Sequence, residues 1–131
     1  MDHRGTPDYP GRVATIVPDP EDVVWGVAYA LEGDRKKILA YLDHREKGGY
    51  ERLELLVERN CGNSLPVLCY VGQSDLPTYI GPEVEEQTAE VISKAQGPSG
   101  VNREYLKMLQ SSLAEFEISN SHVDRLVGLL Q

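Results

Sequence analysis

The glycine pair Gly48-Gly49 constrains the fold most, because it separates a helical pattern from a strand pattern. Before the pair, residues 34–47 repeat apolar side chains at the helical spacing of about 100° per residue. After it, residues 50–57 alternate leucines with charged side chains, as half-buried strands do. Glycine commonly ends a helix. The sequence therefore predicts a helix that begins at Asp34, its expected N-cap, and a strand that begins at Tyr50.

Glu46 lies on the apolar face of this predicted helix, four residues after Leu42. The C-terminal end of a helix disfavours a negative charge, and the following glycines let a ligand approach the backbone. These features suit a functional carboxylate. Glu46 equally suits an ordinary exposed acid at a helix end, neutralised by Arg45 or Lys47. The residues alone leave both interpretations open.

The remaining pattern predicts an α+β protein. Residues 12–17 and 23–31 are rich in β-branched and apolar side chains and are separated by a short proline-containing link, which favours an antiparallel pair of strands. Residues 66–72 are apolar on both faces, which favours a central strand. Three helices are expected to follow, starting near Pro82, near Ser99 and at Ser121, where Ser121 and Asp124 have capping-box spacing.

Composition excludes several classes of function. A net charge of −8 over 131 residues argues against a nucleic-acid surface, which needs a basic footprint. No apolar run reaches the roughly 18 residues of a membrane span, and the start of the chain lacks a signal-peptide pattern. We therefore expect a cytoplasmic protein. Two cysteines and three scattered histidines lack the spacing of a metal site, so we expect no metal.

Residues 97–102, Gly-Pro-Ser-Gly-Val-Asn, allow two interpretations. A glycine-rich loop that leads into a helix N-terminus is a possible anion site. The same residues suit an ordinary turn between helices, with Ser99 as the N-cap.

Several motifs, in order along the chain, resemble the ChaC family of glutathione-specific γ-glutamylcyclotransferases. These motifs are His3-Arg4-Gly5, Pro10-Gly11-Arg12-Val13, Trp25-Gly26-Val27-Ala28-Tyr29, Tyr41-Leu42-Asp43, Arg45-Glu46-Lys47-Gly48-Gly49-Tyr50, Tyr79-Ile80-Gly81-Pro82, Gly97-Pro98-Ser99-Gly100 and Asn102-Arg103-Glu104-Tyr105-Leu106. The resemblance covers nearly the whole chain. The last predicted helix, from Ser121 onward, matches the family pattern only loosely.

The resemblance implies a γ-glutamylcyclotransferase-like fold, a small mixed or antiparallel, partly closed β-barrel flanked by helices, as a single domain over residues 1–131. It implies cleavage of glutathione to 5-oxoproline and Cys-Gly by a monomer without metal or organic cofactor. The family's catalytic glutamate falls on Glu46, which would act as general acid and base. Tyr50 and Tyr105 match family positions near the cavity and are expected to contact substrate.

One departure from the family pattern concerns the start of the chain. Members of the family begin with a strand that leads into a Tyr-Gly-Ser-Leu loop, and this motif does not occur in the sequence. We therefore expect an N-terminally incomplete domain that lacks the first strand. Loss of such positioning donors can cost about 10²–10³ in rate per donor. The alternative to a working enzyme is thus a weakly active or non-catalytic relative that binds γ-glutamyl ligands or a partner protein.

Overall fold

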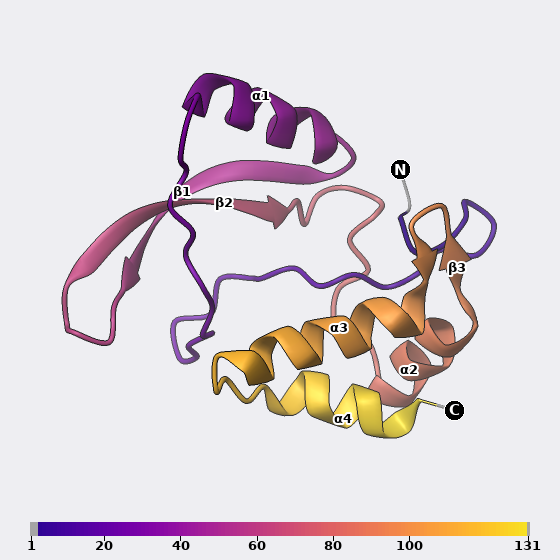
Figure 1. Cartoon of the computed structure of the whole chain (residues 1–131). Helices are drawn as coiled ribbons and strands as arrows, with labels where there is room; N and C mark the ends of the chain where they lie inside the picture. Colours follow the sequence, from indigo (N-terminus) through magenta and orange to yellow (C-terminus); the bar gives the residue numbers. More distant parts are fainter. Residues whose placement is uncertain (1–2, 131) are drawn as a thin grey trace. The chain divides into compact units, whose positions relative to one another are not determined.

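The computed structural model describes residues 3–130, which fold as two units. One unit combines the residues up to Ala14 with those from Ile80 onward, and the other is Thr15–Tyr79. The single domain expected from the sequence stays a prediction. Along the chain the elements are α1 (Arg35–Arg45), β1 (Tyr50–Glu58), β2 (Ser64–Gly72), α2 (Glu85–Lys94), β3 (Gln96–Gly97), β4 (Gly100–Val101), α3 (Asn102–Glu115) and α4 (Ser121–Leu129), as Figure 1 shows.

The first unit is built on the packing of α2, α3 and α4 against one another (Figure 1). Their apolar faces form a buried cluster, since burial of aliphatic side chains is the main driving force for such packing. The cluster consists of Ala89, Ile92, Leu106, Val123 and Leu126. Between α2 and α3 the chain makes the short antiparallel hairpin β3–β4.

Asn102 fastens the N-terminal segment to α3. Its side chain is fully buried; its Oδ1 accepts from Arg12 N at 2.6 Å and its Nδ2 donates to Arg12 O at 2.7 Å. The Asn102 side-chain amide thus makes the two backbone hydrogen bonds to Arg12 that a neighbouring strand would make in a sheet. A methyl group at Gly11 would lie 2.8 Å from Asn102 Oδ1 and 2.5 Å from Arg4 O, so only glycine permits this close approach.

The second unit contains α1 and the antiparallel pair β1–β2, in a register that sets Tyr50 opposite Gly72 and Glu58 opposite Ser64. Figure 1 shows α1 beside this pair. As predicted, Asp34 is the N-cap of α1 and accepts from Lys37 N at 3.3 Å. The glycine pair follows the helix end, and β1 begins at Tyr50 as expected. Gly49 has a φ of +133°, a region that side chains other than glycine rarely adopt.

Two strand predictions were wrong: within residues 3–130 neither 12–17 nor 23–31 forms a strand. β-propensity makes a strand only where a neighbouring edge supplies the hydrogen bonds. In the first segment side chains replace that edge, since Asn102 holds Arg12 and the Tyr105 hydroxyl accepts from Ala14 N at 2.9 Å. In the second segment the apolar side chains are exposed, with Val23 at 75% and Tyr29 at 78%.

The predicted partly closed barrel was also wrong in part. Among the described residues, the two sheets are separate, two-stranded and antiparallel, so β2 is not a central strand. The α+β class is confirmed.

Two helix starts and one helix cap differ from prediction, whereas α4 begins at Ser121 as predicted. α2 begins at Glu85, after Pro82, because the first hydrogen bonds of the helix run to Val84 O. α3 begins after Val101 rather than Ser99, since Ser99 lies in the β3–β4 turn and its N donates to His3 O at 2.9 Å. That amide already has a protein acceptor and is not free to bind an anion. α4 is capped by Asn120, whose Oδ1 accepts from Val123 N, instead of by Ser121.

The structure bears on three further expectations. No helix in residues 3–130 has the length and apolar character of a membrane span. Cys61 is exposed and Cys69 half-buried, and neither is in a disulfide. In the same part of the chain, no three His, Cys, Asp or Glu side chains group as metal ligands.

We predict that Asn102→Ala destabilises the first unit. The substitution removes the two hydrogen bonds that the fully buried Asn102 side chain makes to the backbone of Arg12, and each bond is worth about 0.5–1.5 kcal/mol. Denaturant unfolding followed by circular dichroism measures the loss. Asn60→Ala, in the exposed turn after β1, is the matched control. An Asn102→Ala midpoint equal to that of the control would contradict the role assigned to the amide.

Candidate active site

Glu46 lies directly after α1 as its C-cap, and its backbone N donates to Leu42 O at 2.9 Å. Its side chain is only 20% exposed. The half-buried residues from Ile38 to Glu46 all lie on one face of the helix, as the spacing predicted: Ile38, Leu39, Leu42, Asp43 and Glu46. Arg45 Nε donates to Glu46 Oε1 at 3.2 Å, from a side chain that is 60% exposed. Glu46 is thus a partly desolvated carboxylate with a solvent-accessible cation beside it.

Tyr50 begins β1, and its backbone contacts the backbone of Glu46. Its N donates to Glu46 O at 3.4 Å, so the turn through Gly48-Gly49 brings the two residues together. Gly49 O accepts from Gln73 N at 3.0 Å, and a side chain at Gly49 would begin 3.0 Å from Thr78 Oγ1. The glycine therefore lets the end of the helix and the end of β2 approach closely.

Asp43 is a polar residue of the site that sequence reasoning missed. Its carboxylate accepts from Arg52 Nη1 at 2.7 Å and 3.0 Å and from the Tyr70 hydroxyl at 2.6 Å. Burial, together with the hydrogen bond to the Asp43 carboxylate, raises the pKa of Tyr70 above its usual value. The signal available in the sequence was the spacing of Asp43, three residues before Glu46 on the same helical face.

Tyr105 belongs to the other unit, on α3. It is half-buried, its ring lies 5.6 Å from the Arg4 guanidinium, and its hydroxyl oxygen accepts from Ala14 N at 2.9 Å. The hydroxyl proton remains available to a ligand. The structure thus brings Glu46 and Tyr50 together, while Tyr105 sits beside the N-terminal segment of its own unit.

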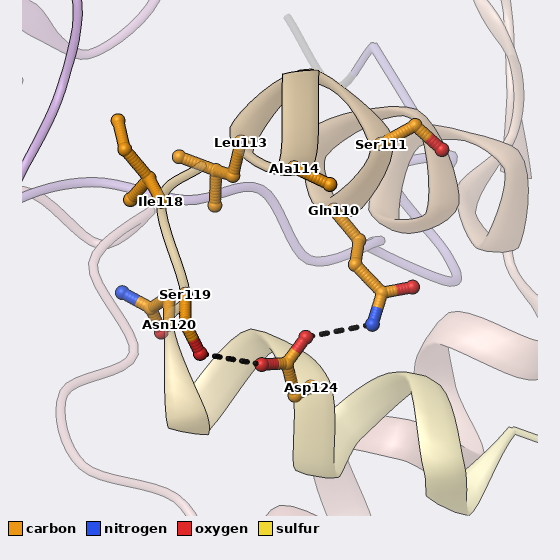
Figure 2. A pocket seen from close by; sticks show the side chains of 8 residues that line it. All are labelled: Gln110, Ser111, Leu113, Ala114, Ile118, Ser119, Asn120 and Asp124. Carbon is orange, nitrogen blue, oxygen red and sulfur yellow. Dashed lines mark hydrogen bonds between the residues drawn. The ribbon is translucent and has the colours of Figure 1, made fainter. Parts of the chain in front are cut away.

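An open pocket of about 340 Å³ lies between α3 and α4 (Figure 2). Asp124 accepts from Gln110 Nε2 at 2.7 Å and from Ser119 Oγ at 3.3 Å along its wall. None of the three predicted site residues lines it. Its acidic lining residue, Asp124, is already paired with Gln110 and Ser119, so we do not place the active site there.

Arg12 forms a forked, largely buried ion pair with Glu83 in the unit that contains Tyr105. Its Nη2 and Nε donate to the two oxygens of Glu83 at 2.9 Å and 3.0 Å, and both side chains are about four-fifths buried. This forked contact is the strong form of a charge-assisted hydrogen bond. It lowers the pKa of Glu83 to about 2, helped by a hydrogen bond from Thr88.

Fold and site together define an α+β protein with a half-buried carboxylate at the C-terminal end of α1. The whole chain, residues 1–131, matches the model of the family described as ChaC-like protein. The protein therefore belongs to the ChaC family.

Its relatives carry consistent names. The chain is 39% identical to γ-glutamylcyclotransferase 2-3 of Arabidopsis thaliana, over 97% of this chain and 68% of the relative. It is 33% identical to the glutathione-specific γ-glutamylcyclotransferase of Saccharomyces cerevisiae, over 89% and 71%. For glutathione-specific γ-glutamylcyclotransferase 1 of Homo sapiens the identity is 41%, over 82% of this chain and 50% of the relative.

The fold agrees with a solved structure. The crystal structure of the selenomethionine-labelled γ-glutamyl cyclotransferase specific to glutathione from yeast superposes with a TM-score of 0.82 at 27% identity, covering 98% of this chain and 79% of that one. The γ-glutamylcyclotransferase-like fold implied by the sequence is thereby confirmed.

We predict that Glu83 makes folding stability pH-dependent below pH 5. Because its pKa is lower in the folded protein (about 2) than in the unfolded chain (about 4.5), its stabilisation is present above pH 4.5 and is lost as pH falls through 2. The shift corresponds to stability on the order of 2–3 kcal/mol. Denaturant unfolding of Glu83→Gln at several pH values measures it, with Glu86→Gln, exposed on α2, as control. A difference from the parent that stays constant between pH 6 and pH 3 would refute the assignment.

Proposed function

We propose that this protein is a glutathione-specific γ-glutamylcyclotransferase that converts glutathione to 5-oxoproline and Cys-Gly. The observation that carries the proposal is the half-buried Glu46 at the end of α1, in a chain that belongs to the ChaC family. The names of its Saccharomyces cerevisiae and Homo sapiens relatives support glutathione as the substrate.

The reaction needs one nucleophile and one proton carrier. The α-amine of the γ-glutamyl group attacks its own γ-carbonyl carbon, forming the new C–N bond of 5-oxoproline while the amide bond to cysteine breaks. Glu46 takes the proton that the amine loses and returns it to the departing nitrogen. A carboxylate placed within reach of both nitrogens serves both steps, and such proton transfer contributes about 10²–10⁴ in rate.

The neighbours of Glu46 fit this cycle. Glu46 is half-buried, with a side chain that is 20% exposed, so a bound substrate can reach the carboxylate at its exposed edge. The Arg45 guanidinium is mostly exposed, so it can move aside when the substrate amine approaches the same carboxylate. No metal or organic cofactor takes part in the proposed steps.

The attack is intramolecular, so binding must mainly hold the substrate folded on itself. We assign Tyr50 and Tyr105 to substrate contact. Tyr50 is joined through its backbone to Glu46, and the Tyr105 hydroxyl keeps its proton for donation.

We predict that Glu46→Gln lowers the release of Cys-Gly from glutathione at least about 10²-fold, because the amide cannot accept or return the proton. Glu54→Gln, an exposed glutamate of β1, is the matched control and should keep full activity. Product release is followed by chromatography, and circular dichroism checks that both variants fold. Equal rates for Glu46→Gln and the parent would rule out Glu46 as the proton carrier.

Calorimetric titration with glutathione separates the enzyme from the non-catalytic alternative. Heat of binding from the parent chain without formation of 5-oxoproline would favour a ligand-binding relative. Turnover by the parent chain excludes that alternative.

A further inference from the structure

The contacts of Asp43 join α1 to both strands of the β1–β2 pair. Arg52 lies on β1 and Tyr70 lies on β2, and the two residues are directly opposite each other in the register. Opposite residues of an antiparallel pair project on the same side of the sheet. A single carboxylate on the helix therefore receives a donor from each strand, with Arg52 at 2.7 Å and Tyr70 at 2.6 Å.

The apolar contacts of α1 are weaker than those of the other helices. Its inward-facing Ile38, Leu39 and Leu42 are only half-buried, and the helix has no buried residue. By comparison, α3 contributes Leu106 at 4% exposure and α4 contributes Leu126 at 4%. A helix with so little buried surface depends on other contacts to fix its rotation. Hydrogen bonds to an ionised group are stronger than those between neutral groups, and here one comes from each strand, so together they can set that rotation.

Asp43 and Glu46 are three residues apart, so they lie on the same helical face one turn apart. A rotation or fraying of the last turn of α1 moves both carboxylates together. Glu46 has its own backbone tie to the helix through Leu42 O, so it follows the helix closely. Fixing Asp43 against the sheet therefore fixes Glu46.

We propose that Asp43, held by Arg52 and Tyr70, is the positioning residue for Glu46. The inference rests on the proposed function, in which Glu46 carries the proton. Asp43 touches neither substrate nor the reacting atoms; it keeps the last turn of α1 in the orientation that proton transfer needs. A displacement of about 1 Å at a reacting group can cost 10²-fold in rate.

Asp43→Asn tests the proposal with the smallest change of shape. The asparagine side chain has nearly the same shape as aspartate. It is uncharged and has one acceptor oxygen in place of two, so it cannot accept strong hydrogen bonds from both Arg52 and the Tyr70 hydroxyl. We expect kcat for glutathione to fall about 10- to 100-fold while KM changes less than about threefold. Tyr70→Phe, which removes one of the donors, should give a smaller loss in kcat. Asp75→Asn, an exposed aspartate outside the strands, is the matched control and should leave both constants unchanged.

Amide hydrogen exchange gives a readout that needs no turnover. In Asp43→Asn the peptides covering residues 38–48 should exchange at least about tenfold faster than in the parent chain, whereas those of α3 should be unchanged. Exchange that stays at the parental rate in residues 38–48 would overturn the proposal. So would equal acceleration in α3, because it indicates general destabilisation.

The two hypotheses fail in different ways. If the parent chain does not turn over glutathione, the proposed function fails, and the exchange rates still decide whether Asp43 holds the helix. If the parent is active and Asp43→Asn retains parental kcat, the positioning role fails while the role of Glu46 stands on its own variant.

Discussion

The hydrogen bonds between the Asn102 side chain and the backbone of Arg12 are the constraint on which the helical unit depends. They connect residues that are 90 positions apart in the chain, and they do so inside the protein, where an unpaired amide is most costly. With Arg12 held there, its guanidinium reaches Glu83 ahead of α2, and Ala14 reaches the hydroxyl of Tyr105. One buried amide thus organises contacts to two helices.

In the other unit, too, one side chain joins separate elements, but there the side chain is a carboxylate rather than an amide. Asp43 ties a helix to two strands through charge-assisted bonds, where Asn102 ties an extended segment to a helix through neutral ones. The difference suits their surroundings. A neutral amide tolerates complete burial, whereas a carboxylate keeps part of its hydration and is stabilised by the Arg52 charge. The unit with the large aliphatic cluster supplies rigidity, and the unit with the candidate carboxylate has few buried apolar contacts. Functional segments are often drawn from such less stable regions.

Local signals in the sequence predicted the elements whose formation depends on nearby residues. The cap at Asp34, the face shared by Leu42 and Glu46, and the start of β1 after two glycines all follow from spacing and turn chemistry. Prediction failed where a partner distant in the chain decides the outcome. Arg12 lies in a segment with the composition of a strand, yet its backbone N donates to the Asn102 side chain on α3. No local sequence pattern indicates this hydrogen bond. The cap of α4 differed by one position because Asn120 and Ser121 are both good capping residues.

The residues of the candidate site also differ in how far the sequence predicted them. Helical periodicity was enough to place Glu46 on the inward face, and the resemblance to the ChaC family identified it among the acidic residues. The contribution of Asp43 was not visible in the sequence, because it depends on the register that sets Arg52 opposite Tyr70. Side chains that act through a neighbour leave weak sequence patterns, whereas the groups that react leave strong ones.

The exposed segment from Val23 to Tyr29 has a consequence for how this protein behaves at high concentration. Exposed segments with apolar side chains, lying outside a sheet, can form strands with other chains, which leads to aggregation. Here it is flanked by acids, with Glu21-Asp22 before it and Glu32 after it, and Gly26 interrupts it. Charges at the ends of an apolar run keep copies apart by mutual repulsion. The net negative charge of the chain thus opposes association between copies. Added salt weakens this effect by screening the repulsion between the charges.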